Sequence, residues 1–340
     1  MQFNNIIILT VPKTSNKFFT LVELNKAHFT KSTFFYILIL TNKSAVIRER
    51  IIKMAYIIII VIIAIILVYM RIETTLLSKS RINFSTSSKG LKIVHLSDIH
   101  INKIFIPVSR LLRCIRQAAP DIIIISGDYI EVPRDIPKFI DFLKPLTDIC
   151  KVCLTLGNHD HNALDSNTQR ISDFVRQLEA AGAEVLINSH TKIRKDRYTY
   201  NLIGIDDLRR GRPDITKAFK DISPSFETGC INIAISHNPD IVFQLPPNKA
   251  DYLLCGHFHG GQIWMPFNLE FKLMRSEKLC KMKCFRGLHK INGINMYINR
   301  GLGNVIFPFR FFSLPEVAVI QLPVSLGNTD ESTGGIKYGN

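Results

Sequence analysis

Residues 54–70 form an apolar run, Met-Ala-Tyr-Ile-Ile-Ile-Ile-Val-Ile-Ile-Ala-Ile-Ile-Leu-Val-Tyr-Met, that contains no charge and no helix breaker. Its length lies at the lower limit for a helix that crosses a bilayer, and Ile51 and Ile52 extend its apolar character. A buried core helix is the alternative, because a helix that is apolar on every face lies either in a domain core or in a membrane. Because no small-residue cleavage site follows, we expect a retained transmembrane anchor and not a removed signal peptide.

The segments that flank this run differ from it in composition. Residues 1–53 are expected to be an irregular extension, and Met54 suggests the hypothesis that translation begins there, so that the extension is not made. Residues 71–90, rich in Ser and Thr, are expected to be a polar linker. Basic residues stand on both sides of the run. If the chain begins at Met54, only the downstream cations, such as Arg71 and Lys79, remain to be kept inside, which predicts an inner-membrane protein with a cytoplasmic domain.

Residues 91–322 alternate short apolar runs with helix-like segments, which predicts an α/β domain, followed by a flexible tail at 323–340. Strands are expected at 91–96, 121–126, 152–156, 202–205, 231–236, 252–254, 296–298 and 317–322, and helices at 108–118, 136–143 and 166–181.

The charge and the cysteines restrict the partners and the compartment. A formal net charge of +15 favours an anionic partner, and nucleic acid, phosphorylated metabolites and an acidic membrane surface all qualify. The seven cysteines are an odd number and stand mostly in apolar runs, which argues against a disulfide framework and for a reducing compartment. The spacings Cys150-x2-Cys153 and Cys280-x3-Cys284 would suit zinc half-sites, although the first pair lies in or beside an expected strand, where buried thiols are the simpler interpretation.

Five of the expected strands end in polar clusters. These clusters are Ser97-Asp98-Ile99-His100, Ser126-Gly127-Asp128, Gly157-Asn158-His159-Asp160, Ser236-His237-Asn238 and Gly256-His257-Phe258-His259-Gly260-Gly261-Gln262. Ligands of open α/β sheets bind beyond the carboxyl ends of the strands. We also expect His257 and His259, two residues apart on extended backbone, to point the same way.

The residue types in these clusters suit a phosphoesterase with two metal ions. Carboxylate, imidazole and amide oxygen favour Mn2+, with iron or zinc as alternatives, and Asp128 is well suited to bridge two ions. Taken singly, Asn158 could be an ordinary turn residue and His237 an ordinary loop histidine. Five strand ends that carry Asp, His and Asn together are hard to assign to chance.

The set Asp98-x-His100, Gly127-Asp128, Gly157-Asn158-His159-Asp160, His237 and Gly256-His257-x-His259 resembles the signature of calcineurin-like metallophosphoesterases. The resemblance implies a four-layer α/β/β/α sandwich with a dinuclear metal centre. By that resemblance, Asp98, His100 and His259 would hold one metal, Asn158, His237 and His257 the other, and Asp128 would bridge them. His159 would face the scissile phosphate in a catalytic role. One departure is that the motif at Asp128 reads Gly-Asp-Tyr-Ile-Glu, without a second aspartate three residues on, which puts the support around the ligands in doubt.

Finer features resemble the membrane-anchored bacterial subgroup of that family. They are Gly260-Gly261-Gln262, Gly204-Ile-Asp-Asp207, Gly211-Arg-Pro213, Asn299-Arg-Gly-Leu-Gly303 and Pro315-Glu316. That subgroup includes phosphodiesterases of uncertain substrate and a UDP-2,3-diacylglucosamine pyrophosphatase of lipid A synthesis.

An insertion at 267–290 interleaves basic with large apolar residues, a composition that suits a segment lying on anionic lipid. The alternative is a solvated amphipathic element that packs on the domain. The later segment 307–312, Phe-Pro-Phe-Arg-Phe-Phe, would suit ordinary core, with a similar segment lying on lipid as the alternative.

These features favour a membrane enzyme that hydrolyses an amphiphilic phosphorylated substrate, most specifically UDP-2,3-diacylglucosamine. The alternatives are a phosphodiesterase for another phospholipid, a cyclic nucleotide or nucleic acid, and a catalytically silent membrane scaffold. Nucleic acid is the less expected partner because it gives the anchor no purpose. The oligomeric state is not indicated.

Overall fold

The computed structural model describes residues 31–85 and 87–325, and the chain divides into two units, one ending at Ile62 and one beginning at Ile63. Helix α1 (Lys31–Glu73) continues from the first unit into the second. Its part Ala45–Glu73 reaches a mean hydropathy of 3.2 and is the one described helix that is long and apolar enough to cross a membrane. A helix suits lipid because its backbone groups are bonded internally.

The first sheet of the second unit contains six strands in the order β1-β12-β2-β3-β4-β5. Strands β2 to β5 are parallel to one another, and β12 pairs antiparallel with β2 and parallel with β1. Their continuous apolar sequences are typical of parallel strands that are buried on both faces. The bounds are β1 Ser78–Asn83, β2 Lys92–Leu96, β3 Ile122–Ser126, β4 Lys151–Thr155, β5 Ala183–Val185 and β12 Glu316–Gln321.

The second sheet also contains six strands, in the order β10-β11-β9-β8-β7-β6. Its four central strands are parallel, and the edge strands β6 and β10 each form an antiparallel hairpin with their neighbours β7 and β11. The bounds are β6 Ser189–Lys195, β7 Tyr198–Gly204, β8 Ile231–Ile235, β9 Tyr252–Cys255, β10 Gly287–Ile291 and β11 Ile294–Ile298.

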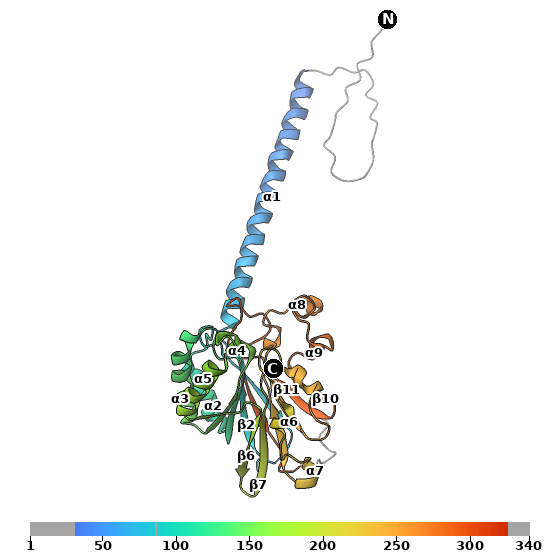
Figure 1. Ribbon diagram of the computed structural model, residues 1–340. Helices are drawn as coiled ribbons and strands as arrows, with labels where there is room; N and C mark the ends of the chain where they lie inside the picture. The colour runs from blue at the N-terminus through green and yellow to red at the C-terminus, as the bar shows by residue number, and fades with distance from the viewer. Residues whose placement is uncertain (1–30, 86, 326–340) are drawn as a thin grey trace. The chain divides into compact units, whose positions relative to one another are not determined.

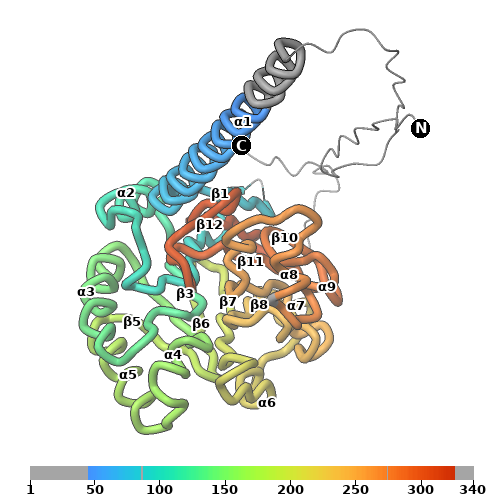
Figure 2. Tube along the Cα trace, turned by 90° about the horizontal axis from the view of Figure 1, so that it is seen from above, coloured from blue at the N-terminus to red at the C-terminus, as the bar shows by residue number. Residues whose placement is uncertain are grey.

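The two sheets pack face to face, and helices cover their outer faces, so the expected four-layer α/β/β/α sandwich is confirmed (Figure 1). Ile93, Ile124 and Leu254 lie in the core between the sheets. Figure 2 shows α2 (Val108–Ala118), α3 (Ile136–Thr147) and α5 (Thr168–Ala180) on one side. The other side carries α6 (Ile215–Ala218), α8 (Leu269–Met274) and α9 (Lys278–Lys281). The remaining short helices are α4 Asn158–Ala163, α7 Ser225–Thr228, η1 Pro133–Asp135, η2 Pro239–Phe243, η3 His259–Gly261 and η4 Pro266–Asn268.

Two expectations about the N-terminal part need correction. The interpretation of residues 1–53 as irregular is wrong for 31–53, which belong to α1, while 1–30 lie outside the described residues. The linker expected at 71–90 begins with the last turn of α1 and contains β1. Strand β1 reads Ser-Lys-Ser-Arg-Ile-Asn, and no local pattern marks it, because it is an edge strand that forms only by pairing with β12 from the far end of the domain.

The flexible tail expected at 323–340 lies outside the described residues from 326 on.

The segments 267–290 and 307–312 also differ in part from expectation. Within 267–290, Phe271 and Leu279 are buried against the second sheet and β10 joins that sheet, so this part packs on the domain. Phe267 is exposed. The expectation of ordinary core at 307–312 is wrong for Phe307 and Phe312, which are both more than half exposed, at 61% and 55%.

Candidate metal centre

The strand ends of both sheets meet at one place in the structure. Strands β2, β3 and β4 of the first sheet lead into Asp98, His100, Asp128, Asn158 and His159, and β8 and β9 of the second lead into His237, His257 and His259. All of these side chains are buried except that of His159, which is half-buried. Because parallel strands end at one edge, packing two such sheets face to face gathers residues that are far apart in sequence.

One group of potential metal ligands contains Asp98, His100 and His259, whose ligand atoms lie within 4.8 Å of one another. Nε2 of His259 lies 3.1 Å from Oδ1 of Asp98. The rings of His100 and His259 are stacked with 5.2 Å between their centroids. This group combines one carboxylate with two imidazoles, a donor set that suits a borderline divalent ion.

A second group contains Asp128, His237 and His257, again within 4.8 Å of one another. Nε2 of His237 lies 3.0 Å from Oδ2 of Asp128 and 3.2 Å from Nδ1 of His257. Nδ1 of His237 is held 2.7 Å from the carbonyl oxygen of Ser126, which leaves Nε2 to face the group. A backbone contact of this kind fixes the orientation of a ligating imidazole.

Asp128 connects the two groups. Its Oδ2 lies 3.7 Å from Nε2 of His100, a member of the first group, and 3.0 Å from Nε2 of His237 in the second. The Cβ of any residue at Gly157 would overlap the Asp128 carboxylate, so the chain must come close here without a side chain. Asp128 therefore lies between the two groups, close to a ring nitrogen of each.

Four buried polar atoms around this centre lack hydrogen-bond partners among the described residues. They are Oδ1 of Asn158, Nδ1 and Nε2 of His100, and Nδ1 of His259. Buried polar atoms are rarely left unpaired, because each one loses its hydration without compensation. A divalent metal ion fits this donor set, because it would take the amide oxygen of Asn158 and one ring nitrogen of each histidine, while Nδ1 of His100 lies 3.4 Å from Glu131.

His159 lies beside both groups without joining either pair of histidines. It forms a third cluster with His100 and Asp128, and its ring meets that of His100 edge-on, with the centroids 4.8 Å apart. Its backbone N–H donates to Oδ1 of Asp128 at 2.8 Å. Burial lowers the pKa of His159 below its ordinary value, so the imidazole is largely neutral at pH 7.

The expectation that His257 and His259 point the same way is wrong. Their φ angles are +75° and +51°, so the backbone is left-handed and not extended, and the two side chains enter different groups. Asp98, His100 and Asp128 also have positive φ angles of 49°, 39° and 60°. Such backbone is costly for residues with a side chain and is concentrated at functional sites.

The buried carboxylates of this centre are ionised and stabilise a positive charge on a neighbouring histidine. Burial opposes ionisation of Asp98 and Asp128, but the histidines beside them lower the pKa values of both carboxyls below their ordinary range. Burial likewise opposes the charge on His237, yet Asp128 and Asp98 raise the pKa of His237 to about 10. Without a metal ion, His237 therefore carries a proton at the position where a divalent cation would lie. Metal binding would release that proton.

Four further residues support the ligands, and sequence analysis did not assign them to the site. Asp160 accepts backbone N–H groups from Asp128, Tyr129, Ile130 and Gly157. Glu131 lies 3.4 Å from Nδ1 of His100, so the carboxylate support that the departure at this motif put in doubt is present. Contact with His100 lowers the pKa of Glu131 to about 2. Asp160 and Glu131 belong to the motifs around Asn158 and Asp128. Their places within these motifs were the sequence signal that could have identified them.

The other two residues are Glu277 and Arg275 of the insertion. Oε1 of Glu277 lies 3.0 Å from Nε2 of His257. Arg275 donates from Nη2 to the carbonyl oxygen of His257 at 3.0 Å, and its Nη1 lies 3.2 Å from Nε2 of the same ring. No sequence pattern marks these two residues, because only the folding of 267–290 onto the second sheet brings them here.

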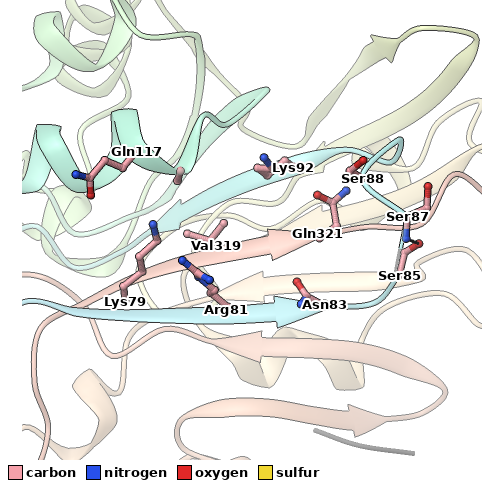
Figure 3. Close-up of a pocket in the computed structure, with 11 residues that line it drawn as sticks. Lys79, Arg81, Asn83, Ser85, Ser87, Ser88, Lys92, Gln117, Val319 and Gln321 are labelled. Atoms are coloured by element: carbon pink, nitrogen blue, oxygen red, sulfur yellow. Dashed lines mark hydrogen bonds between the residues drawn. The ribbon is translucent and has the colours of Figure 1, made fainter. Parts of the chain in front are cut away.

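A groove of about 430 Å³ lies elsewhere, along β1, β12 and β2 (Figure 3). Lys79, Arg81 and Lys92 line it, and none of the candidate metal ligands does. The cysteines are free, and none of the potential ligand groups among the described residues includes one, so the zinc half-sites have no support.

The fold and the donor set define the class of the protein as a metal-dependent phosphoesterase. The chain belongs to the calcineurin-like phosphoesterase family, whose model matches residues 91–261. It is 33% identical over 237 residues to the uncharacterized metallophosphoesterase YkoQ of Bacillus subtilis (strain 168), covering 69% of this chain and 84% of the relative. It is 28% identical to phosphodiesterase YaeI of Escherichia coli (strain K12), covering 70% and 84%. It is 26% identical to UDP-2,3-diacylglucosamine pyrophosphatase LpxG of Chlamydia trachomatis serovar D, covering 74% and 90%.

Proposed function

We propose that this protein is a membrane phosphohydrolase that cleaves the diphosphate of UDP-2,3-diacylglucosamine to the acyl-sugar 1-phosphate and UMP in lipid A synthesis. The observation that carries the hydrolase part is the pair of buried donor groups joined by Asp128. The substrate is supported by the similarity to the chlamydial pyrophosphatase, which extends over 74% of this chain. The helix α1 supports a substrate that itself resides in a bilayer.

In this proposal the cofactors are two divalent ions, with Mn2+ expected first and iron or zinc as alternatives. Asp98, His100 and His259 would hold one ion and Asn158, His237 and His257 the other, with Asp128 shared. When bound, such ions supply Lewis-acid activation of water and neutralise charge on the phosphoryl group.

In this proposal two side chains would act on the substrate itself. His159 has a ring nitrogen within 4.8 Å of a ligand atom of Asp128, and as a hydrogen-bond donor it would stabilise the charge that develops on the departing phosphate oxygen. Arg275 lies at the rim of the second group, where its guanidinium can pair with the second phosphate of the diphosphate. Together they would orient a diphosphate so that one phosphorus faces the paired ligand groups.

The location that we propose is the inner membrane, with α1 as the anchor and the catalytic domain in the cytoplasm. Basic residues flank the apolar run on both sides, so this orientation rests on the hypothesis that translation begins at Met54. In that case Arg71, Lys79, Arg81 and Lys89 are the flanking cations that remain, and cytoplasmic flanks of membrane helices are enriched in Lys and Arg. An anionic membrane surface is a partner of the domain in this proposal.

A broader phosphodiesterase activity is the second candidate, and the similarity to the E. coli phosphodiesterase favours it. Its substrate would be another phospholipid, a cyclic nucleotide or nucleic acid. A nucleic-acid substrate predicts affinity for oligonucleotides that falls steeply with salt.

The deciding experiment incubates the purified full chain and Mn2+ with UDP-2,3-diacylglucosamine and measures UMP, in parallel with a soluble aryl phosphodiester. We expect both products from the wild type, and loss of both in Asp128→Ala and His159→Ala. Glu227→Ala, at an exposed position of α7, is the matched control. Cleavage of the aryl phosphodiester without UMP would support the second candidate, and no cleavage of either would refute both.

A further inference from the structure

Two neighbouring loops of the second unit expose an unusual number of large apolar side chains. We define the apolar rim as Trp264, Met265, Phe267, Ile306, Phe307 and Phe312, all of which are exposed, Phe267 by 82%. The two loops are joined, because the N–H of Trp264 donates to the carbonyl of Phe311 at 2.9 Å and the ring centroids of Trp264 and Phe312 are 6.0 Å apart. Exposed apolar clusters of this kind mark interaction sites.

Hydrogen bonds from two buried side chains tie the loops of the apolar rim to the domain. The buried guanidinium of Arg310 donates to the carbonyl oxygens of Arg300 and Ser313 at 3.1 and 2.8 Å, which fixes the second loop from inside. Gln262 donates to the carbonyls of Val305 and Phe307 at 2.9 and 3.0 Å. The apolar side chains are therefore presented on an ordered frame and not on a loop that could fold them away.

The backbone of the apolar rim is also strained. Phe267, Ile306 and Phe312 have φ angles of +61°, +57° and +53°. A left-handed backbone is a genuine outlier for a β-branched residue such as Ile306 and is unfavourable for any residue with a side chain. Phe267 and Ile306 remain 82% and 62% exposed within the described chain, which points to an external surface that covers them.

The end of α1 identifies that surface. Residues from Ile63 on belong to the same unit as the apolar rim, and the N–H of Arg310 donates to the carbonyl of Met70 at 3.1 Å. The ring of Tyr69 lies 6.0 Å from that of Phe311 and 6.3 Å from that of Phe312. Tyrosine at the end of an apolar helix, followed by a cation such as Arg71, is typical of the membrane–water boundary.

We propose that the apolar rim is a second membrane-binding surface, which inserts Phe267, Ile306 and Phe307 into the boundary of the bilayer that α1 spans. This inference rests on the proposal that α1 spans a bilayer and not on the identity of the substrate. The hydroxyl of Ser313, the residue after Phe312, donates to the carbonyl of His259 at 2.8 Å, so the second loop of the rim contacts the backbone of a candidate metal ligand. A substrate held in the bilayer would meet the rim beside that ligand.

Trp264 makes the inference testable, because it is the single tryptophan of the chain. The full chain is reconstituted into nanodiscs of phosphatidylethanolamine and phosphatidylglycerol, with or without bromine on the acyl chains. We expect bromine near the headgroup end of the chains to quench Trp264 emission, and bromine near the chain terminus to quench it less. Unchanged emission in brominated discs, together with full quenching by iodide from solution, would overturn the proposal.

A double variant and a control separate the surface from the catalytic centre. Phe267→Ser with Phe307→Ser is expected to lose the bromine quenching and to cleave a lipid-borne phosphodiester several-fold more slowly. Phe226→Ser alters a phenylalanine that is 77% exposed on α7, at the end of the unit opposite α8, and should behave as wild type (Figure 1).

The soluble aryl phosphodiester monitors the metal centre throughout. The rate of its cleavage should be unchanged in both variants. Absence of its cleavage by the wild type would refute the proposed hydrolase activity and would leave the fluorescence result unaffected. A dimer by light scattering, in which Trp264 is shielded from both bromine and iodide, would assign the rim to a second copy of the chain and overturn the membrane contact.

Discussion

At the scale of single residues, the metal centre depends on side chains that do not themselves face a metal. Glu277 and Glu131 each place a carboxylate against an imidazole of the ligand groups, at His257 and His100 respectively. A carboxylate behind a ligating histidine fixes the orientation of the ring and raises its basicity. The two groups of ligands are thus each supported by an acidic residue from outside.

Glu277→Gln should weaken metal binding at the second group. We expect a loss of about 10–100-fold in Mn2+ affinity or activity, because Gln cannot supply the charge that orients His257. Isothermal titration with Mn2+ measures the affinity, and kcat and KM on the aryl phosphodiester separate the effect on metal from that on substrate. Glu227→Gln is the exposed control. Equal affinities for wild type and Glu277→Gln would contradict this role.

The buried pair of His161 and Asp206 predicts a pH-dependent stability. Nε2 of His161 lies 2.7 Å from Oδ1 of Asp206. Burial opposes the charge, but the carboxylate raises the pKa of His161 above its ordinary value. The resulting stabilisation is fully present below the unfolded pKa of about 6.5 and is lost as the pH rises through the folded pKa.

Asp206→Asn should therefore destabilise the protein more at about pH 6 than at about pH 9. Urea unfolding of the full chain in detergent at the two pH values measures the difference. Asp141→Asn, at an exposed position of α3, is the control. If Asp206→Asn lowers the free energy of unfolding by the same amount at both pH values, the proposed stabilisation by the charged His161–Asp206 pair is wrong.

At the scale of elements, Glu316 holds three strands together. From β12 its carboxylate accepts the hydroxyl of Ser80 on β1 and, at 2.7 Å, that of Tyr297 on β11 of the other sheet. It also accepts the backbone N–H and the Nη2 of Arg300, at 3.0 and 3.2 Å. The edge strand β1 and the contact between the sheets therefore share one buried anion.

Glu316→Ala should lower the free energy of unfolding by about 3 kcal/mol, because it leaves buried donors and the Arg300 cation unpaired. Thermal or denaturant unfolding measures the loss, and hydrogen exchange should show β1 opening first. Glu227→Ala is again the control. Retained protection of β1 in Glu316→Ala would show that pairing with β12 alone suffices.

At the scale of the whole molecule, the two sheets enclose a centre in which Asp98 and Asp128 form their close ion pairs with histidines. A metal ion that binds the folded chain and not the unfolded chain stabilises the folded state by mass action. Removal of metal by EDTA should lower the melting temperature and abolish activity, and added Mn2+ at 100 times its Kd should restore about 2.7 kcal/mol per site. Differential scanning calorimetry measures the shift. Asp128→Ala should show a smaller shift, and an equal one would place the metal elsewhere.

Much of this molecule was predictable from its sequence. The α/β alternation, the apolar run of α1 and the five polar strand ends are local patterns, because burial and periodicity are set by neighbouring residues. The strand ends also converge by a general rule, since parallel strands direct their carboxyl ends to one edge of a sheet.

Other features were decided by tertiary structure alone. Strand β1 has no local signal and exists through its pairing with β12. The resemblance assigned His257 and His259 to different metals, but alternation could not show that they diverge through left-handed backbone. Glu277 supports His257 only because the insertion folds onto the second sheet. In each case the deciding contact joins residues far apart in the chain, whereas sequence patterns report on neighbours.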